Sequence, residues 1–253
     1  KITVIKSLLA SQLVYILSPL PTNCEYVKLI QKELYTFLWN GKNDKIKRTE
    51  IINNYSDGGL RMLDLKTFSR SLKFTWIQKY LNNKNNEKWK IFFDYHLSRY
   101  GGPFIFSCNI SKEDIKYLEI PNQFLNEILE LWAEVHFIEK DCLDQNAKKK
   151  QSIWNNSYIR IGNKPVYYNN WIKNGILNIE QLLDTQDNLL KYEGFKEKFQ
   201  NLKTHFLEYM AIVLVTKNFL KPDTYVNEKI REIRTITIPQ VVSESKLNRL
   251  VYN

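Results

Sequence analysis

At 253 residues the chain is long enough for one large domain or two modest ones, and 43% apolar residues exclude a disordered protein. Its 8 Gly and 7 Pro are too few for a turn-rich β-sandwich and favour helices with short connections. The net charge of +10 is uneven, because residues 1–100 carry 17 Lys and Arg against 8 Asp and Glu, whereas residues 101–253 carry 20 against 19. This asymmetry predicts that the first part faces a polyanion; a codon bias towards lysine is the alternative.

The first two predicted elements are amphipathic helices. Apolar residues recur at helical spacing over residues 2–17, and Pro19 and Pro21 end this helix because proline lacks the amide donor. The second helix begins at the capping-box pattern Thr22–Glu25, whose side chains can satisfy exposed backbone amides. Two such helices with a short link are expected to pack as an antiparallel pair.

Two further helices are expected before the clearest break in the chain. Asp64 can cap a third helix that carries Leu65, Phe68 and Leu72, and a fourth covers about residues 86–100. The break is Gly101-Gly102-Pro103, where we place a domain boundary.

The second part also has mainly helical patterns. We expect residues 147–151 to be a solvated basic linker, and short extended segments around a turn at Gly162-Asn163. The expected helices cover residues 111–118, 121–137, 171–174, 179–183 and 203–219. The sequence therefore predicts a mainly α protein. It has a basic helical domain over residues 1–100, a mostly helical domain with minor strands over residues 104–220, and a linker and truncated element over residues 221–253.

Cations in the first domain are the candidate binding residues. Four lie in a loop: Lys42, Lys45, Lys47 and Arg48. Arg61 follows a pair of glycines, and Lys66, Arg70 and Lys73 share one face of the third helix at positions i, i+4 and i+7. Such an arrangement suits the phosphate oxygens of a nucleic-acid backbone, without reading its sequence. An ordinary solvated face is the alternative.

Four aromatic residues of the second domain could stack on bases: Trp154, Tyr167, Tyr168 and Trp171. Their apolar neighbours make a place in the hydrophobic core the favoured interpretation.

No chemistry of catalysis or metal binding is expected. The three cysteines are far apart and form no C-x-x-C pair, and the three histidines are equally scattered. There is no paired-aspartate motif, P-loop, H-E-x-x-H or G-x-S-x-G motif. No apolar run approaches the roughly 20 residues of a membrane span. We therefore expect an intracellular protein, in the nucleus or the cytoplasm, that is not an enzyme by itself, with no cofactor and no membrane partner.

Several blocks of sequence, taken in order along the chain, resemble a known protein family. Residues 1–9, Leu20-Pro21, residues 37–41 and residues 58–65 resemble the thumb of non-LTR (LINE-type) retrotransposon reverse transcriptases. In the second part, residues 154–157, residues 161–168, Trp171 and Gly175-Ile176 resemble the segment that follows that thumb. The resemblance covers most of residues 1–220, and the palm, the endonuclease and the late Cys/His cluster of the family have no counterpart here.

The resemblance implies a fragment whose true start lies upstream of Lys1. The intact enzyme would be an RNA-directed DNA polymerase with magnesium in its palm, copying RNA from a nicked DNA end. Residues 1–100 would grip the backbone of an RNA–DNA or RNA duplex beside that palm. The partners implied are therefore nucleic acid and the rest of the parent polyprotein. The competing hypothesis is a helical structural or protein-interaction module whose basic face only keeps it in solution.

Overall fold

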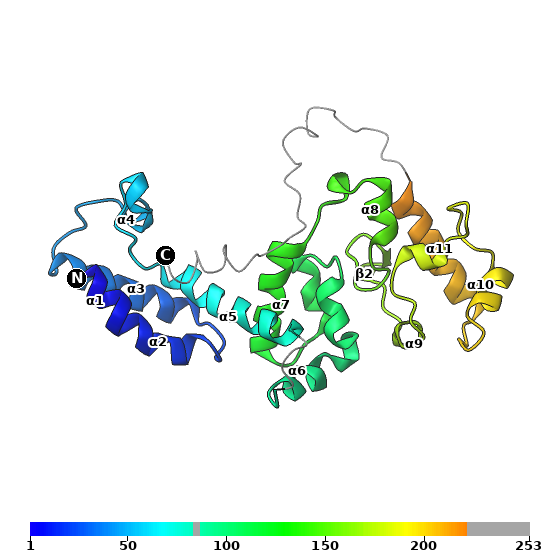
Figure 1. Ribbon diagram of the computed structural model, residues 1–253, viewed down its shortest axis with the longest axis horizontal. Coiled ribbons are helices and arrows are strands. Elements are labelled where there is room, and N and C mark those ends of the chain that lie inside the picture. Colours follow the sequence, from blue (N-terminus) through cyan, green and yellow to red (C-terminus); the bar gives the residue numbers. More distant parts are fainter. Residues whose placement is uncertain (83–86, 222–253) are drawn as a thin grey trace. The chain divides into compact units, whose positions relative to one another are not determined.

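The computed structural model describes residues 1–82 and 87–221 (Figure 1). The chain divides between residues 83 and 84 into two compact units, which we call unit 1 and unit 2. Their described parts are residues 1–82 and residues 87–221. Both parts are mainly helical, and the sheet found in the described ranges has two short strands. The mainly α fold class predicted from the sequence is confirmed.

Unit 1 begins with an unbroken helical stretch of three elements: α1 (Ile2–Val4), the π-helical turn η1 (Ile5–Leu9) and α2 (Ala10–Leu17). The elements that follow are α3 (Cys24–Trp39), α4 (Arg48–Ile52), the 3₁₀ turn η2 (Tyr55–Asp57) and α5 (Leu65–Leu81). The predicted helices over residues 2–17, from Thr22 and from Asp64 are therefore present. The sequence did not predict α4, because five residues are too few to show helical periodicity.

The core of unit 1 draws on each of its longer helices. Its buried members are Ile5, Leu17, Val27, Leu34, Tyr35, Ile51, Met62 and Leu65. Both α2 and α3 pack against α5. Ile51 is only 1% exposed, so this side chain fixes the short helix α4 to the core of unit 1. In Figure 1, α4 lies at the end of unit 1 where α1 begins and α3 ends.

The helix starts in unit 1 follow capping chemistry, with one correction. Asp64 caps α5 as predicted, since its carboxylate accepts from the Thr67 amide at 3.1 Å. The predicted capping box at Thr22 is wrong, because α3 starts one residue later. Its cap is Asn23, whose Oδ1 accepts from the amides of Glu25 (2.9 Å) and Tyr26 (3.3 Å). An asparagine is at least as good a cap as a threonine.

The predicted domain boundary at Gly101-Gly102-Pro103 is also wrong, because this segment is packed inside unit 2. Gly101 has a φ of 94° and joins two 3₁₀ turns. A Cβ placed on it would lie 3.3 Å from Phe104 and 3.7 Å from Ile172. Glycine at position 101 therefore allows a tight turn inside unit 2 and does not mark a linker. The predicted segment over residues 221–253 lies outside the described residues apart from Lys221.

Unit 2 is a succession of short helices and turns. Its first elements are α6 (Lys90–Leu97), η3 (Ser98–Tyr100), η4 (Gly102–Ser107), η5 (Lys112–Leu118), α7 (Gln123–His136), η6 (Lys140–Cys142) and α8 (Gln145–Lys150). Then follow β1 (Arg160–Ile161), β2 (Lys164–Pro165), α9 (Asn169–Lys173), η7 (Ile179–Leu182), α10 (Tyr192–Lys198) and α11 (Phe206–Leu220).

The predicted turn at Gly162-Asn163 is confirmed, and the predicted basic linker is wrong. Strands β1 and β2 pair antiparallel around the turn, with Arg160 opposite Pro165. Residues 145–150 instead form α8, capped by the Asp144 carboxylate, which accepts from the Ala147 amide at 2.6 Å. Lys148 of this helix is 2% exposed, so the lysine run lies partly against unit 2. Across residues 1–82 and 87–221, no helix is long and apolar enough to cross a membrane.

Candidate nucleic-acid interface

The basic loop of unit 1 starts at the C-terminal end of α3, where several hydrogen bonds fix the backbone. Asn40 ends α3 in the left-handed conformation (φ 56°), and the Gly41 amide donates to Thr36 O at 2.8 Å. The ammonium of Lys1 donates to Phe37 O at 2.7 Å and also to the side chain of Asn40. These contacts satisfy carbonyls that a helix end leaves without partners, so the loop leaves α3 in a defined direction.

The four cations of this loop differ in their surroundings. Lys42, Lys45 and Lys47 are exposed and make no ion pair with a described residue. Arg48 is held on both sides. Its Nε donates to the Asp44 carboxylate at 2.7 Å, and its guanidinium carbon lies 4.5 Å from the centroid of the Tyr35 ring. The loop therefore presents three lysines to solvent and one arginine that is already partly neutralised.

Arg61 is placed by a tight backbone arrangement between α4 and α5. The amides of Leu60 and Met62 both donate to Ile51 O, at 3.1 and 2.9 Å, and the Arg61 amide donates to Asn53 O at 2.9 Å. Gly59 makes this possible, because a Cβ there would lie 2.1 Å from the Asn53 carbonyl oxygen. The Arg61 backbone is left-handed, with a φ of 51°.

A second side-chain contact fixes where this segment enters α5. The amide group of Gln31 on α3 donates from Nε2 to Leu63 O at 2.9 Å and accepts at Oε1 from the Leu65 amide at 2.7 Å. One glutamine thus satisfies both a carbonyl and an amide of the connection. The segment that carries Arg61 is consequently tied to α4 at one end and to α3 at the other.

The Arg61 side chain lies near the ring of Tyr55. The guanidinium carbon of Arg61 is 5.2 Å from the centroid of the Tyr55 ring, and its Nε is buried without a hydrogen-bond partner. Burial lowers the pKa of the Lys6 ammonium, and the positive charge of Arg61 lowers it further. Nothing in the sequence position of Lys6 indicates an electrostatic interaction with a residue 55 positions later.

The three cations predicted on α5 do not form one exposed set. Lys66 is exposed and Arg70 is half-buried, whereas Lys73 is fully buried. The ammonium of Lys73 donates to the Thr22 hydroxyl and, at 3.5 Å, to that of Ser69. The prediction of Lys73 as a phosphate-binding residue is therefore wrong, because the turn between α2 and α3 packs against the later half of this helix face. Trp76 marks the same contact, donating to the Ser18 carbonyl at 3.2 Å.

The candidate stacking residues of unit 2 belong to its core, as the favoured interpretation held. Trp154 and Trp171 are 0% and 2% exposed, with ring centroids 5.5 Å apart. The Trp154 indole donates to Ile176 O at 2.7 Å. Tyr167 and Tyr168 are half-buried against the same core. Large aromatics that are buried and satisfied in this way have no face left for a base, so stacking by the two tryptophans is ruled out.

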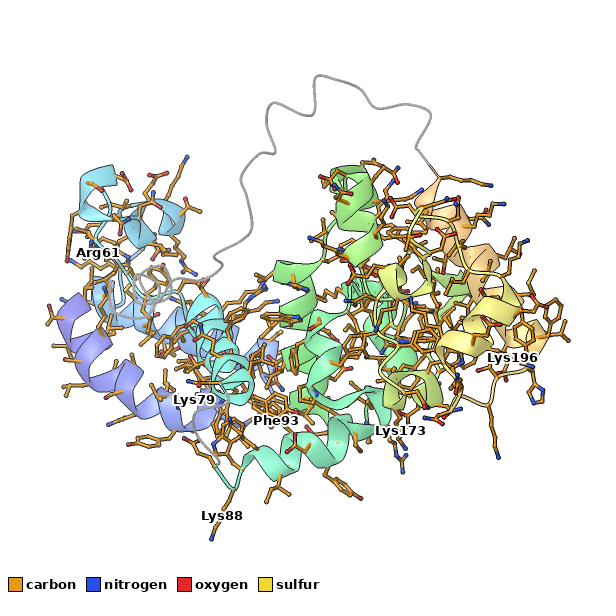
Figure 2. All side chains as sticks on the ribbon, turned by 45° about the vertical axis from the view of Figure 1, so that its right-hand side comes forward. Arg61, Lys79, Lys88, Phe93, Lys173 and Lys196 are labelled. Carbon is orange, nitrogen blue, oxygen red and sulfur yellow. The ribbon has the colours of Figure 1, made fainter. Side chains whose placement is uncertain are left out.

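The described parts of the two units differ in charge. Residues 1–82 carry 13 Lys and Arg against 6 Asp and Glu, whereas residues 87–221 carry 18 against 17. The excess of positive charge therefore lies in unit 1, even with the boundary at residue 83 in place of residue 101. Figure 2 labels Arg61 at the end of unit 1 that carries α4, and Lys79 in the last turn of α5.

No group of three or more His, Cys, Asp or Glu side chains in the described ranges is placed to hold a metal ion. Comparison with protein-family models, with curated proteins and with solved structures finds no match for this chain.

Proposed function

We propose that unit 1 binds the backbone of a nucleic-acid duplex through the end that carries α4, as the thumb of a non-LTR reverse transcriptase. The observation that carries this proposal is the set of cations before and after α4 that make no ion pair with a described residue: Lys42, Lys45, Lys47 and Arg61. A surface of this kind gains free energy from the release of counterions condensed on phosphates. The resemblance of residues 1–9 and 58–65 to that thumb supports the same interpretation.

In this proposal the chain is a non-catalytic part of an RNA-directed DNA polymerase. It positions an RNA–DNA hybrid for a palm that lies elsewhere in the parent protein and that would hold the magnesium ions. The exposed lysines contact phosphate oxygens and distinguish no base sequence, because an ammonium group on a flexible stem acts as a point charge. Unit 2 braces the assembly or contacts RNA away from its two buried tryptophans.

The test measures binding of the whole 253-residue chain to a labelled RNA–DNA hybrid at several salt concentrations. Changing Lys42, Lys45 and Lys47 to Gln should weaken binding similarly for two unrelated sequences, with the salt slope falling by roughly one unit per lost phosphate contact. The matched control changes three exposed lysines of unit 2, Lys173, Lys196 and Lys203, to Gln. Equal binding by both triple variants would refute the proposal.

One observation favours the alternative of a protein-interaction module. Helix α11 exposes apolar side chains on neighbouring turns, among them Leu207 (78% exposed), Met210 and Leu214. Exposed apolar surface of this kind is typical of protein contacts. The salt series separates the two functions, because a basic face that only keeps the protein in solution would leave hybrid binding absent at every salt concentration.

A further inference from the structure

Helix α6 of unit 2 carries a cluster of aromatic rings on its surface that the binding of a duplex by unit 1 does not use. Tyr95 is 76% exposed, Phe92 is 42% exposed and His96 is half-buried. The three rings are in contact, because the centroid of His96 lies 4.6 Å from that of Phe92 and 5.2 Å from that of Tyr95. Ile91, 67% exposed, lies one helical turn before Tyr95. We call Ile91, Phe92, Tyr95 and His96 the α6 patch. An exposed apolar cluster of this kind is typical of a binding surface.

The opposite side of α6 fixes the direction in which the patch points. Phe93 and Leu97 are 2% and 0% exposed. The Phe93 ring meets the Trp89 ring edge-on at 5.3 Å and the Phe124 ring of α7 at 6.5 Å. The helix therefore already has a face in the core of unit 2, and the α6 patch is a second face that points away from that core.

The geometry of the rings leaves flat aromatic surface open to solvent. The Tyr95 and His96 rings meet at 83° and the Phe92 and His96 rings at 65°, so these contacts are made edge to face. Among the described residues no ring lies face to face with Tyr95. An open, flat ring suits a planar partner, and every nucleobase has such a face. Tyr95 thus has the accessibility that the buried rings of Trp154 and Trp171 lack.

Two cations flank the rings on the same side of the helix. Lys88, Phe92, Tyr95 and Arg99 follow each other at i, i+4, i+7 and i+11, which places them on one helical face. Lys88 and Arg99 are exposed and make no ion pair with a described residue. Figure 2 shows Lys88 pointing away from the ribbon. At helical rise the two positions are about 16 Å apart, a length that covers several phosphates at roughly 3.4 Å per phosphate of a stacked strand.

The carboxylates of the same stretch do not cancel this charge at the patch. The Glu87 carboxylate accepts a hydrogen bond from the Trp89 indole. Asp94 is the residue next to Tyr95, so it is turned by about 100° around the helix from that ring. Apolar protein surface would gain nothing from the two flanking cations, whereas a nucleic-acid strand offers bases to the rings and phosphates to the cations. The charges therefore favour a nucleic acid as the occupant.

We infer that the α6 patch binds single-stranded nucleic acid, with an unpaired base stacked on Tyr95 and with Lys88 and Arg99 contacting phosphates of the same strand. Duplex bases are stacked on one another and offer no free face to the ring, so the patch selects unpaired nucleotides. That such a strand reaches this chain rests on the proposed function. The inference gives unit 2 a role in that function, the binding of unpaired RNA or DNA.

The experiment compares two probes on the whole chain: a single strand of about 12 nucleotides, as RNA and as DNA, and a blunt RNA–DNA hybrid. Tyr95→Ala should weaken binding of the single strand roughly tenfold and leave the affinity for the hybrid unchanged. Tyr95→Phe should retain the affinity, because it keeps the ring face. Changing both Lys88 and Arg99 to Gln should lower the salt slope for the single strand by about 1.4 units, at roughly 0.7 unit per phosphate contact.

A fluorescent adenine analogue in the single strand reports stacking directly. Its emission should fall on binding to the parent chain, because stacking on a ring quenches it, and should fall less with Tyr95→Ala. Tyr15→Ala is the matched control. Tyr15 is an equally accessible helical tyrosine, 84% exposed, but Ser11 and Gln12 one turn before it carry no charge. It should change neither the affinity for the single strand nor the quenching, and equal losses for the two tyrosine variants would overturn the inference.

The results separate the patch from the proposed function. If the hybrid binds and Tyr95→Ala leaves the single strand unaffected, the inference is overturned and the proposed function stands. If the single strand binds through Tyr95 and the hybrid does not bind, the patch is supported and the grip of unit 1 on a duplex is refuted. If neither probe binds, both proposals are refuted. Loss of self-association in Tyr95→Ala, with binding of the single strand intact, would identify the patch as a protein contact and overturn the inference.

Discussion

The guanidinium of Arg48 lies over the Tyr35 ring, 4.5 Å from its centroid, while its Nε donates to Asp44 at 2.7 Å. Tyr35 is itself part of the core, at 2% exposure. The first contact holds Arg48 against the core of unit 1, and the Asp44 carboxylate partly neutralises its positive charge. Among the loop cations it therefore differs from Lys42, Lys45 and Lys47, which have no such partner in the described ranges.

The first prediction follows from this difference. Replacing Lys42, Lys45 or Lys47 singly by Gln should lower the salt slope of hybrid binding by roughly one unit each, if each contacts a phosphate. Arg48→Gln should lower it by less, because Asp44 already neutralises part of its charge. The measurement is hybrid affinity against salt concentration. A larger loss for Arg48→Gln than for any lysine would mean that Asp44 gives up its partner on binding.

The second prediction concerns the loop that places Arg61. Gly59→Ala should lower the free energy of unfolding by more than about 1 kcal/mol, since its Cβ would lie 2.1 Å from the Asn53 carbonyl oxygen, a backbone atom that cannot turn away. Gly58→Asn is the control. Gly58 has a φ of 76° but open space around its Cβ position, and Asn tolerates left-handed backbone. Chemical denaturation compares the two, and equal stabilities would show that the loop can shift.

Sequence reasoning succeeded where the structure is local. The helices over residues 2–17 and from Asp64 were predictable because periodicity and a capping carboxylate lie within a few residues of each other. The hairpin turn at Gly162-Asn163 followed from its turn residues in the same way. The candidate loop cations were also local, and Lys42, Lys45 and Lys47 are exposed as expected.

It failed where the outcome depends on residues distant in the chain. Lys73 has the spacing of a surface residue, but it is fully buried and donates to the Thr22 hydroxyl, 51 positions earlier. Gly101 has the composition of a linker, but it lies in a packed turn next to Ile172, 71 positions later. Spacing along one helix says which residues share a face, but not what packs against that face.

A third prediction uses two lysines of the same helix. Lys73→Ala should lower the free energy of unfolding by about 2 kcal/mol or more, because it removes a fully buried side chain and its hydrogen bond to Thr22. Lys66→Ala, on an exposed position of α5, should change it by less than about 0.5 kcal/mol. Denaturant titration of both variants checks the difference. Similar stabilities would place Lys73 on the surface and restore it as a phosphate contact.

The fourth prediction is an alkaline loss of stability in unit 2. Burial raises the pKa of the Tyr167 and Tyr209 hydroxyls to about 12, against an ordinary value of 10.0. Between these values the folded unit keeps two protons that the unfolded chain releases. The folded state then binds more protons, so the free energy of unfolding falls as pH rises from about 10 to about 12. Below pH 10 both states are protonated, and neither tyrosine makes stability depend on pH.

The two tyrosines should respond differently to loss of the hydroxyl. The Tyr209 hydroxyl donates to Leu190 O, so Tyr209→Phe should cost about 1 kcal/mol at pH 8. The Tyr167 hydroxyl is buried without a partner, so Tyr167→Phe should cost nothing or add up to about 1 kcal/mol. Either variant should reduce the fall in stability above pH 10, since one shifted group is gone. Denaturation of each variant at pH 8, 10 and 11 checks both effects. A destabilised Tyr167→Phe would mean that its hydroxyl has an acceptor in solution, for which a buried water is the simplest candidate.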